Sequence, residues 1–179
     1  MTVEKYNIPQ IRNMYDILIT LITPIRLQSV LPVLKLPAFD VLTREEEGLT
    51  YVFDIIRKKW LQLTPEEWVR QHVVHLLVDH LNYPRSLFKV ESGLQYNRQQ
   101  KRTDLIVYDQ EGKPYLLVEC KAPDIKVTQK TIEQATMYNQ TLKAPYVAVT
   151  NGLGLFCFAI DFENKKSEQL KQLPLPPSV

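Results

Sequence analysis

Residues 104–122, with the sequence DLIVYDQEGKPYLLVECKA, contain two apolar segments joined by a turn that includes Gly112. Both segments have the β-branched and aromatic content that predicts strands. The second contains LLV, a run that is apolar on both faces and therefore typical of a strand inside a sheet. Charged residues nevertheless follow directly at Glu119 and Lys121, and Asp104 begins the first strand. A paired interior strand that ends in charge is the strongest constraint on the fold.

The rest of the chain supplies an ordered series of predicted elements. Residues 49–63 have the composition of a strand pair, and TPEEWVRQ begins a helix with Thr64 as N-cap, Pro65 at the first position and Glu67 completing a capping box. Further predicted elements are a strand at 86–96, a polar and basic connection at 97–102, a helix at 128–142 and two strands within 145–162. This order predicts an α/β domain with a mixed central β-sheet.

The two ends of the chain are predicted to lie outside this domain. The apolar run at 17–25 is too short to span a bilayer and contains Pro24, and no secretory pattern is clear. We predict an N-terminal arm at 1–40, the α/β domain at 41–172 and a proline-rich, frayed tail at 173–179.

Composition narrows the functional classes only slightly. A net charge of +2 does not argue for nucleic-acid binding by itself, so any such binding depends on local clusters of charge. The two cysteines, Cys120 and Cys157, are too few for a disulfide framework and fit packed thiols in a reducing cytoplasm. The sequence offers no zinc ligand set and no glycine-rich phosphate loop.

Strand geometry predicts that the charges of the hairpin lie close together. Side chains alternate across a sheet, so Glu119 and Lys121 share a face, and Asp104 falls beside Glu119 if the hairpin pairs around Gly112. Two adjacent carboxylates repel unless a cation or protons intervene. Mg²⁺ prefers oxygen ligands, so these carboxylates and the backbone carbonyl of Cys120 could bind it, with Lys121 activating water or stabilising charge on a phosphate. The alternative is an exposed Asp and Glu with the lysine paired across the strand.

The segments RTDLIVYD, LLVECKAP and QATMY, in this order, resemble the PD-(D/E)xK nuclease superfamily. The resemblance is closest to the nuclease domain at the N terminus of the restriction subunit of type I restriction enzymes, and it covers residues 51–162. It implies a restriction-endonuclease-like core sheet flanked by helices, with hydrolysis of DNA phosphodiester bonds dependent on Mg²⁺ (or Mn²⁺). Asp104 and Glu119 match the metal ligands and Lys121 the catalytic lysine. Thr103 stands where the motif name has proline, a position that varies widely.

The second predicted helix carries Gln134 and Tyr138, which match the Q-x-x-x-Y motif found in several branches of the superfamily. The two residues are four positions apart and therefore share one face of the helix. From there, an amide at Gln134 and a phenol at Tyr138 could hold the catalytic lysine or a DNA phosphate. An ordinary pair on the helix surface is the alternative.

The first predicted helix places Glu66 and Arg70 within its apolar stripe, whereas His72 and His75 fall on the opposite side. Charged residues that face inward must pair or contact a polar site. The resemblance implies a glutamate from this helix near the metal, and Glu66 is the candidate because Glu67 is assigned to the capping box. Arg70 is a candidate contact to nucleic acid. An ion pair between Glu66 and Arg70 is the alternative.

Basic residues precede the first charged strand at Arg98, Lys101 and Arg102, where they could bind DNA phosphates without reading sequence. A second basic turn at 57–59 is more simply a solvated turn. We therefore predict a cytoplasmic, Mg²⁺-dependent deoxyribonuclease without membrane attachment, acting alone or with the subunits of a restriction or repair assembly. The alternative is a catalytically silent module with the same fold that binds nucleic acid or a partner protein.

Overall fold

The computed structural model describes residues 31–96 and 99–177, and it describes side chains outside residues 90–103. The chain divides after Val33, and the description that follows concerns the unit that begins at Leu34. Most of the predicted N-terminal arm lies outside the described residues, so the predicted domain boundaries remain predictions. Within the described part of the chain, no helix has the length and apolar character needed to cross a membrane.

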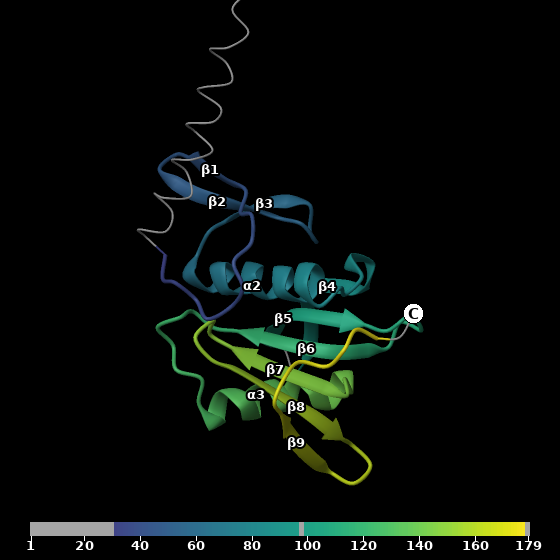
Figure 1. The fold of residues 1–179 in the computed structure, drawn as a ribbon. Helices are drawn as coiled ribbons and strands as arrows, with labels where there is room; N and C mark the ends of the chain where they lie inside the picture. Colours follow the sequence, from purple (N-terminus) through teal and green to yellow (C-terminus); the bar gives the residue numbers. More distant parts are fainter. Residues whose placement is uncertain (1–30, 97–98, 178–179) are drawn as a thin grey trace, which may run out of the picture. The chain divides into compact units, whose positions relative to one another are not determined.

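The centre of the unit is a six-stranded sheet whose strands are neighbours in the order of the sequence. β6 and β7 run parallel, and every other neighbouring pair is antiparallel, so the prediction of a mixed central sheet is confirmed (Figure 1). The strands are β4 (Phe88–Tyr96), β5 (Gln99–Tyr108), β6 (Pro114–Cys120), β7 (Tyr146–Thr150), β8 (Leu155–Asp161) and β9 (Lys166–Leu170). β9 was not predicted, and β5 begins inside the segment expected to be a connection.

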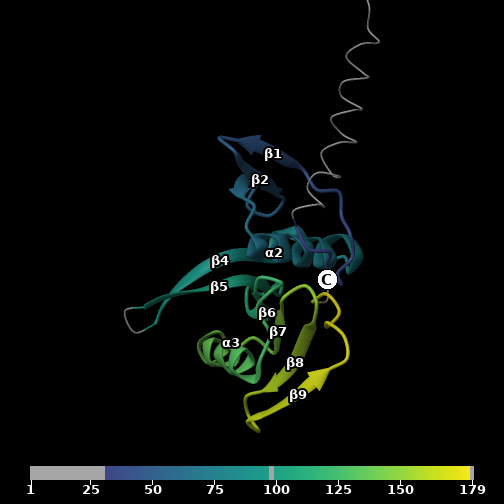
Figure 2. The ribbon, with the colours of Figure 1, turned by 90° about the vertical axis from the view of Figure 1, so that its left-hand side faces the viewer.

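Two helices cover the two faces of this sheet (Figure 2). Helix α2 (Pro65–His75) packs through Val69 and Val73 on the same cluster as Val118, and helix α3 (Gln129–Leu142) packs through Ala135 on Leu117. Val118 and Leu117 are consecutive in β6 and point to opposite faces. The run that is apolar on both faces is therefore an interior strand, as predicted. Burying each large apolar side chain contributes about 1.5–3 kcal/mol.

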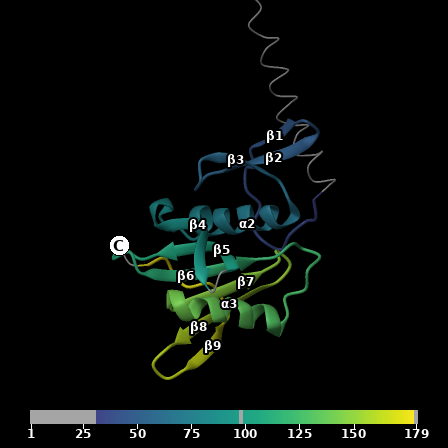
Figure 3. The ribbon, with the colours of Figure 1, turned by 180° about the vertical axis from the view of Figure 1, so that it is seen from behind.

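A smaller antiparallel sheet lies on the side of α2 that faces away from the main sheet (Figure 3). Its strands are β1 (Thr43–Glu46), β2 (Leu49–Asp54) and β3 (Lys59–Gln62). The β2–β3 pair was predicted, whereas β1 was not. Because α2 has neighbours on both sides, its second side is also covered. His72 and His75, on the side opposite the apolar stripe, are buried, and Phe39 stacks on the His75 ring with 4.0 Å between ring centroids.

Helix caps, a glycine turn and two short helices lie at the ends of the main elements. Thr64 accepts a hydrogen bond from the Glu67 N–H (3.1 Å), which confirms the predicted N-cap, and Thr128 caps α3 in the same way through the Thr131 N–H (3.4 Å). Gly152 has φ of +80°, in the region that favours glycine. After α2 the chain continues as a π-helix (Leu76–His80) and, before β4, as a 3₁₀-helix (Arg85–Leu87).

Segments near both ends of the unit contact the core more closely than expected. The Lys35 N–H donates to the Gly152 carbonyl (2.7 Å), and the Leu34 side chain lies against the same glycine. The Tyr83 hydroxyl donates to the Pro174 carbonyl (2.7 Å), and the Tyr115 hydroxyl donates to the Leu175 carbonyl (2.8 Å). Residues 174–175 of the predicted tail are therefore not frayed, because tyrosine hydroxyls bind the carbonyls of this extended segment.

Candidate functional site

β5 and β6 bring the two predicted carboxylates together, although Asp104 lies within β5 rather than at its start, where it was expected, because the strand already begins at Gln99. Leu105 pairs with Val118 in the antiparallel register, and one further step along the same register sets Asp104 opposite Glu119. Residues directly opposite each other on neighbouring strands have Cβ atoms about 4.5–5.5 Å apart. The Asp104 side chain is fixed by the Cys120 N–H, which donates to its Oδ2 atom (2.7 Å). The main chain of β6 therefore holds Asp104 at the end of the hairpin.

Glu119 and Lys121 form an ion pair along β6, with 2.6 Å between Lys121 Nζ and Glu119 Oε1. The lysine thus pairs within its own strand, which differs from the cross-strand alternative. Burial and then the nearby charge of Asp104 raise the pKa of Glu119 above its ordinary value. Burial alone would lower the pKa of Lys121, but the hydrogen bond and charge of Glu119 outweigh it and raise that pKa. Lys121 is therefore held as an ammonium group.

The other carboxylate oxygen of Glu119 is a buried acceptor without a described partner, as is the amide oxygen of Gln71. Glu119 Oε2 is buried, and among the residues whose side chains the structure describes no donor lies within hydrogen-bonding distance. A buried acceptor without a partner costs about 1–3 kcal/mol or more when charged, so such an atom calls for an explanation.

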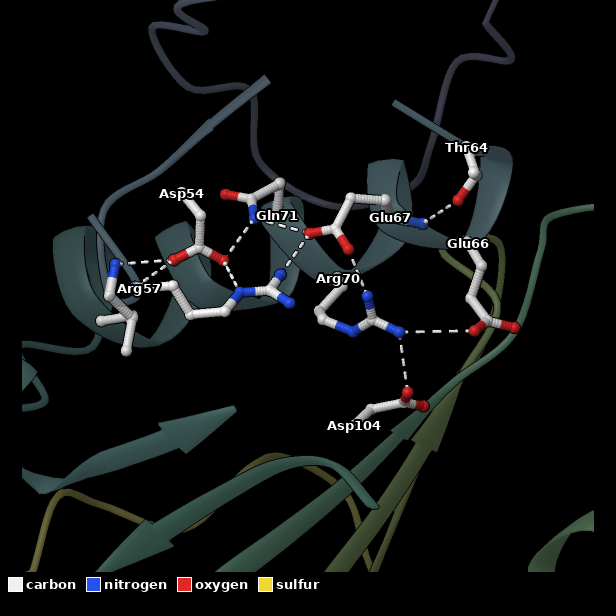
Figure 4. A network of polar contacts seen from close by, with 9 residues as sticks. Asp54, Arg57, Thr64, Glu66, Glu67, Arg70, Gln71 and Asp104 are labelled. Carbon is white, nitrogen blue, oxygen red and sulfur yellow. Dashed lines mark hydrogen bonds and ion pairs between the residues drawn. The ribbon is translucent and has the colours of Figure 1, made fainter. Parts of the chain in front are cut away.

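Arg70 connects helix α2 to this pair of strands. Its Nη2 atom donates to Asp104 Oδ1 (2.7 Å) and to Glu66 Oε1 (3.3 Å), and its Nη1 atom donates to Glu67 Oε2 (Figure 4). The Arg70 side chain is only 6% exposed. Burial alone would lower its pKa, but the charges of Asp104 and Glu67 outweigh burial and raise it. Arg70 was predicted to contact nucleic acid; instead it is buried in an ion-pair network, because Asp104 faces it from the main sheet and two glutamates of its own helix flank it.

Glu67 has a different role from the one predicted. Its backbone N–H completes the Thr64 cap, but its carboxylate points into the interior rather than back to the N-cap (Figure 4). Glu67 Oε1 accepts hydrogen bonds from Arg57 Nη2 (2.8 Å) and Gln71 Nε2 (2.8 Å). The assignment of Glu67 to a reciprocal capping box was therefore wrong, because buried cationic and amide donors bind its side chain.

Asp54 ends this network at the β2–β3 turn. Its Oδ1 atom accepts the backbone N–H groups of Ile56 (2.8 Å) and Arg57 (2.6 Å). Its Oδ2 atom accepts from Arg57 Nε (2.8 Å) and Gln71 Nε2 (2.9 Å). We refer to Asp54, Arg57, Glu67 and Gln71 as the turn cluster. Sequence reasoning missed it, although an aspartate before a turn is a signal for such backbone contacts.

Glu66 lies beside the site but remains partly open to solvent, with 43% of its side chain exposed. Burial and then the charge of Asp104 raise the pKa of Glu66, and the charge of Lys121 opposes this increase. The ion pair with Arg70, given above as the alternative to a metal-binding role, is present, and the charge of Asp104 also acts on Glu66. We refer to Glu66, Asp104, Glu119 and Lys121 as the carboxylate site.

The donor groups of the carboxylate site suit a hard divalent cation. Asp104, Glu119 and Glu66 supply carboxylate oxygens, and the unpartnered Glu119 Oε2 is an acceptor that a cation would satisfy. The side chains are not gathered around one point in this conformation. Within the described part of the chain, no three His, Cys, Asp or Glu residues are close enough to bind one ion. Arg70 and Lys121 neutralise the carboxylates instead.

The remaining predicted residues are placed only in part. Gln134 is exposed and Tyr138 is half-buried, one turn apart on α3, and their roles remain predictions. Arg98 lies outside the described residues, and the side chains of Lys101 and Arg102 lie outside them too. Arg57, in the second basic turn, belongs to the turn cluster and is not a solvated residue.

Comparison with known proteins finds a matching family and matching solved structures. A sequence model of the family described as Type I restriction enzyme R protein N terminus matches residues 65–174, from α2 through β9. A solved fragment described as an HsdR subunit of a type I restriction enzyme from Vibrio vulnificus YJ016 matches with 23% identity and a TM-score of 0.34. That match covers 50% of this chain and 17% of the solved chain. A comparison with curated proteins gives no match.

Proposed function

The chain belongs to the family of type I restriction enzyme R protein N-terminal regions, and from this premise we propose that it is a cation-dependent nuclease module that hydrolyses DNA phosphodiester bonds. The observation that carries the proposal is the carboxylate site, where Asp104 lies opposite Glu119 and Lys121 is held beside them. Three carboxylates converge here from α2, β5 and β6, and one of them has a buried oxygen without a described donor, an arrangement typical of a functional site. We also propose that the module works with other subunits of a restriction assembly.

In the proposed reaction, some residues of the carboxylate site bind the cation and Lys121 stabilises charge on the phosphate. Asp104, Glu119, the Cys120 carbonyl and Glu66 would hold Mg²⁺ or Mn²⁺, with Glu66 the most exposed of the side chains. When bound, such an ion supplies charge stabilisation at the phosphate and lowers the pKa of a bound water. Lys121 has a raised pKa and therefore remains protonated at neutral pH. We assign it to stabilising negative charge that develops on the phosphate rather than to removing a proton from water.

Glu119 has a second role in the proposed function, which is to orient Lys121. Its Oε1 atom binds Lys121 Nζ and so orients the ammonium group, while its Oε2 atom remains available to a cation. One side chain therefore sets the distance between the cation and the lysine. Such prior positioning is the main protein contribution to phosphoryl-transfer chemistry.

One observation favours a second function. Arg70 binds Asp104 directly, and carboxylates whose charge is already neutralised attract a cation less strongly. A catalytically silent module that binds DNA or a partner protein is therefore the competing proposal.

A cleavage assay on plasmid and linear DNA distinguishes the two functions. The wild-type protein should cleave with Mg²⁺ or Mn²⁺ and not with EDTA, and Asp104→Asn, which keeps the side-chain shape, should abolish cleavage. Asp124→Asn is the matched control, because that aspartate is exposed. A wild-type protein that binds DNA in a fluorescence anisotropy assay but cleaves neither DNA nor RNA with any divalent metal would contradict the nuclease proposal and support the silent module.

A further inference from the structure

Arg70 lies between the carboxylate of Asp104, on β5, and that of Glu66, one turn earlier on α2. A single nitrogen, Nη2, donates to both Asp104 Oδ1 (2.7 Å) and Glu66 Oε1 (3.3 Å) (Figure 4). Both carboxylates are cation ligands in the proposed function, so the inference below rests on that proposal. A guanidinium is a rigid, planar cation that binds several carboxylates at once. In this conformation it neutralises the charge that a divalent ion would otherwise neutralise.

The other side of the same guanidinium is anchored independently of the site. Nη1 donates to Glu67 Oε2, and Arg57 and Gln71 fix the opposite oxygen of Glu67. The turn cluster thus offers Arg70 a contact that involves neither Asp104 nor Glu66. Among the contacts described, the two halves of the guanidinium have different partners: Glu67 on one side and the two carboxylates of the carboxylate site on the other.

A divalent ion at Asp104 would lie close to this positive charge. Two cations that share one carboxylate repel each other strongly when they are partly removed from water. We propose that Arg70 is a resident counterion that a divalent cation must displace from Asp104 and Glu66, with Glu67 retaining the displaced guanidinium. Arg70 acts on the reaction only through these carboxylates and is a positioning residue. The displacement makes cation binding weaker than the carboxylates alone would allow.

The test is the affinity of the full chain for Mn²⁺ and Ca²⁺, measured by titration calorimetry without DNA. Arg70→Met removes both the charge and the two-sided contact, and it should tighten cation binding by at least about tenfold. Arg70→Lys keeps the charge but cannot contact Asp104, Glu66 and Glu67 together, so it should tighten binding by about threefold or more. Lys113→Met is the control for net charge, because Lys113 is exposed and pairs only with Glu111 among the contacts described.

The lysine variant separates displacement from a general charge effect. If only the positive charge mattered, Arg70→Lys would bind the cations as the wild type does, and that result would overturn the proposal. A purely structural role for Arg70 predicts weaker binding in both variants, which would overturn it as well. Circular dichroism reports whether each variant is folded. If Arg70→Met does not fold without metal, recovery of its folded signal by Mn²⁺ supports the proposal, and equal or weaker binding by the folded lysine variant still overturns it.

The failure of this proposal is distinguishable from failure of the proposed function. Unchanged or weaker cation binding in the Arg70 variants, together with wild-type DNA cleavage, overturns the counterion proposal alone. The absence of cation binding in every form, together with the absence of cleavage, overturns both.

Discussion

Asp54 and Asp104 lie at opposite ends of one chain of ion pairs, and their surroundings differ in the number of donors relative to carboxylate oxygens. Asp54 is fully buried and accepts hydrogen bonds at both oxygens from backbone N–H groups, a guanidinium and an amide. Burial raises its pKa, but these donors outweigh burial and lower the pKa below its ordinary value. Asp104 has Arg70 and one backbone N–H, and further carboxylates lie near it.

The difference shows how the same residue types produce a structural cluster in one place and a candidate active site in the other. In the turn cluster every carboxylate oxygen of Asp54 and Glu67 accepts a hydrogen bond, so their negative charge is stabilised, and the buried atom without a described partner is the neutral amide oxygen of Gln71. At the carboxylate site, Glu66, Asp104 and Glu119 share Arg70 and Lys121, and one oxygen of Glu119 has no described donor. Excess negative charge raises the pKa of Glu66 and Glu119, in addition to the effect of burial. A buried carboxylate oxygen without a described donor, rather than the presence of charge, distinguishes the candidate site from the turn cluster.

The largest effect is expected at Asp54. Asp54→Asn removes one of the two carboxylates that pair with the buried Arg57 and should lower the free energy of unfolding by about 3–5 kcal/mol, as when a buried ion pair loses one partner. Urea unfolding followed by circular dichroism measures this change, with Asp124→Asn as the exposed control. A loss of less than about 1 kcal/mol would show that the turn cluster contributes little to stability, and its contrast with the carboxylate site would fail.

Lys121→Ala should separate chemistry from stability at the carboxylate site. The lysine is partly exposed, with 27% of its side chain accessible, so its loss should change the free energy of unfolding by less than about 1 kcal/mol. Loss of its charge in the transition state should lower the single-turnover cleavage rate by about 10² to 10³. Lys113→Ala is the matched control. Cleavage by Lys121→Ala at the wild-type rate would remove Lys121 from the proposed chemistry.

The smallest effect is a difference in pH dependence between the two regions. The folded-state pKa of Glu119 is raised, so its stabilising contribution is present below about 4.5, its unfolded value, and is lost as the pH rises through the folded pKa. The folded-state pKa of Asp54 is lowered, so its contribution is present above about 3.8 and is lost as the pH falls through the folded pKa. The two contributions therefore change in opposite directions.

Urea unfolding in EDTA between pH 4.5 and 7.5 measures the Glu119 contribution. The wild type should lose stability relative to Glu119→Gln as the pH rises over this range. Parallel curves for the two proteins would mean that the carboxylate site carries no excess charge in the folded state, and the comparison with the turn cluster would fail.

The sequence alone determined features that depend on local geometry. Alternation along β6 and the β5–β6 turn predicted that Asp104 and Glu119 would lie opposite each other on neighbouring strands, because pairing around one turn fixes the register. The start of β5 was not predicted, since the strand extends five residues before Asp104. The Thr64 cap was also predictable, since an N-cap contact spans only three residues. The interior position of β6 followed from a run that is apolar on both faces.

Only the tertiary structure decided which charges pair. Arg70 reaches Asp104 across 34 positions of sequence, and Gln71 reaches Asp54 across 17. Helical periodicity placed Arg70 on an inward face, but it contains no information about which strand end lies opposite. It also could not show that the small sheet and Phe39 would cover the second side of α2. Partner choice among buried charges depends on how the layers stack, and distant segments meet only when the whole core has formed.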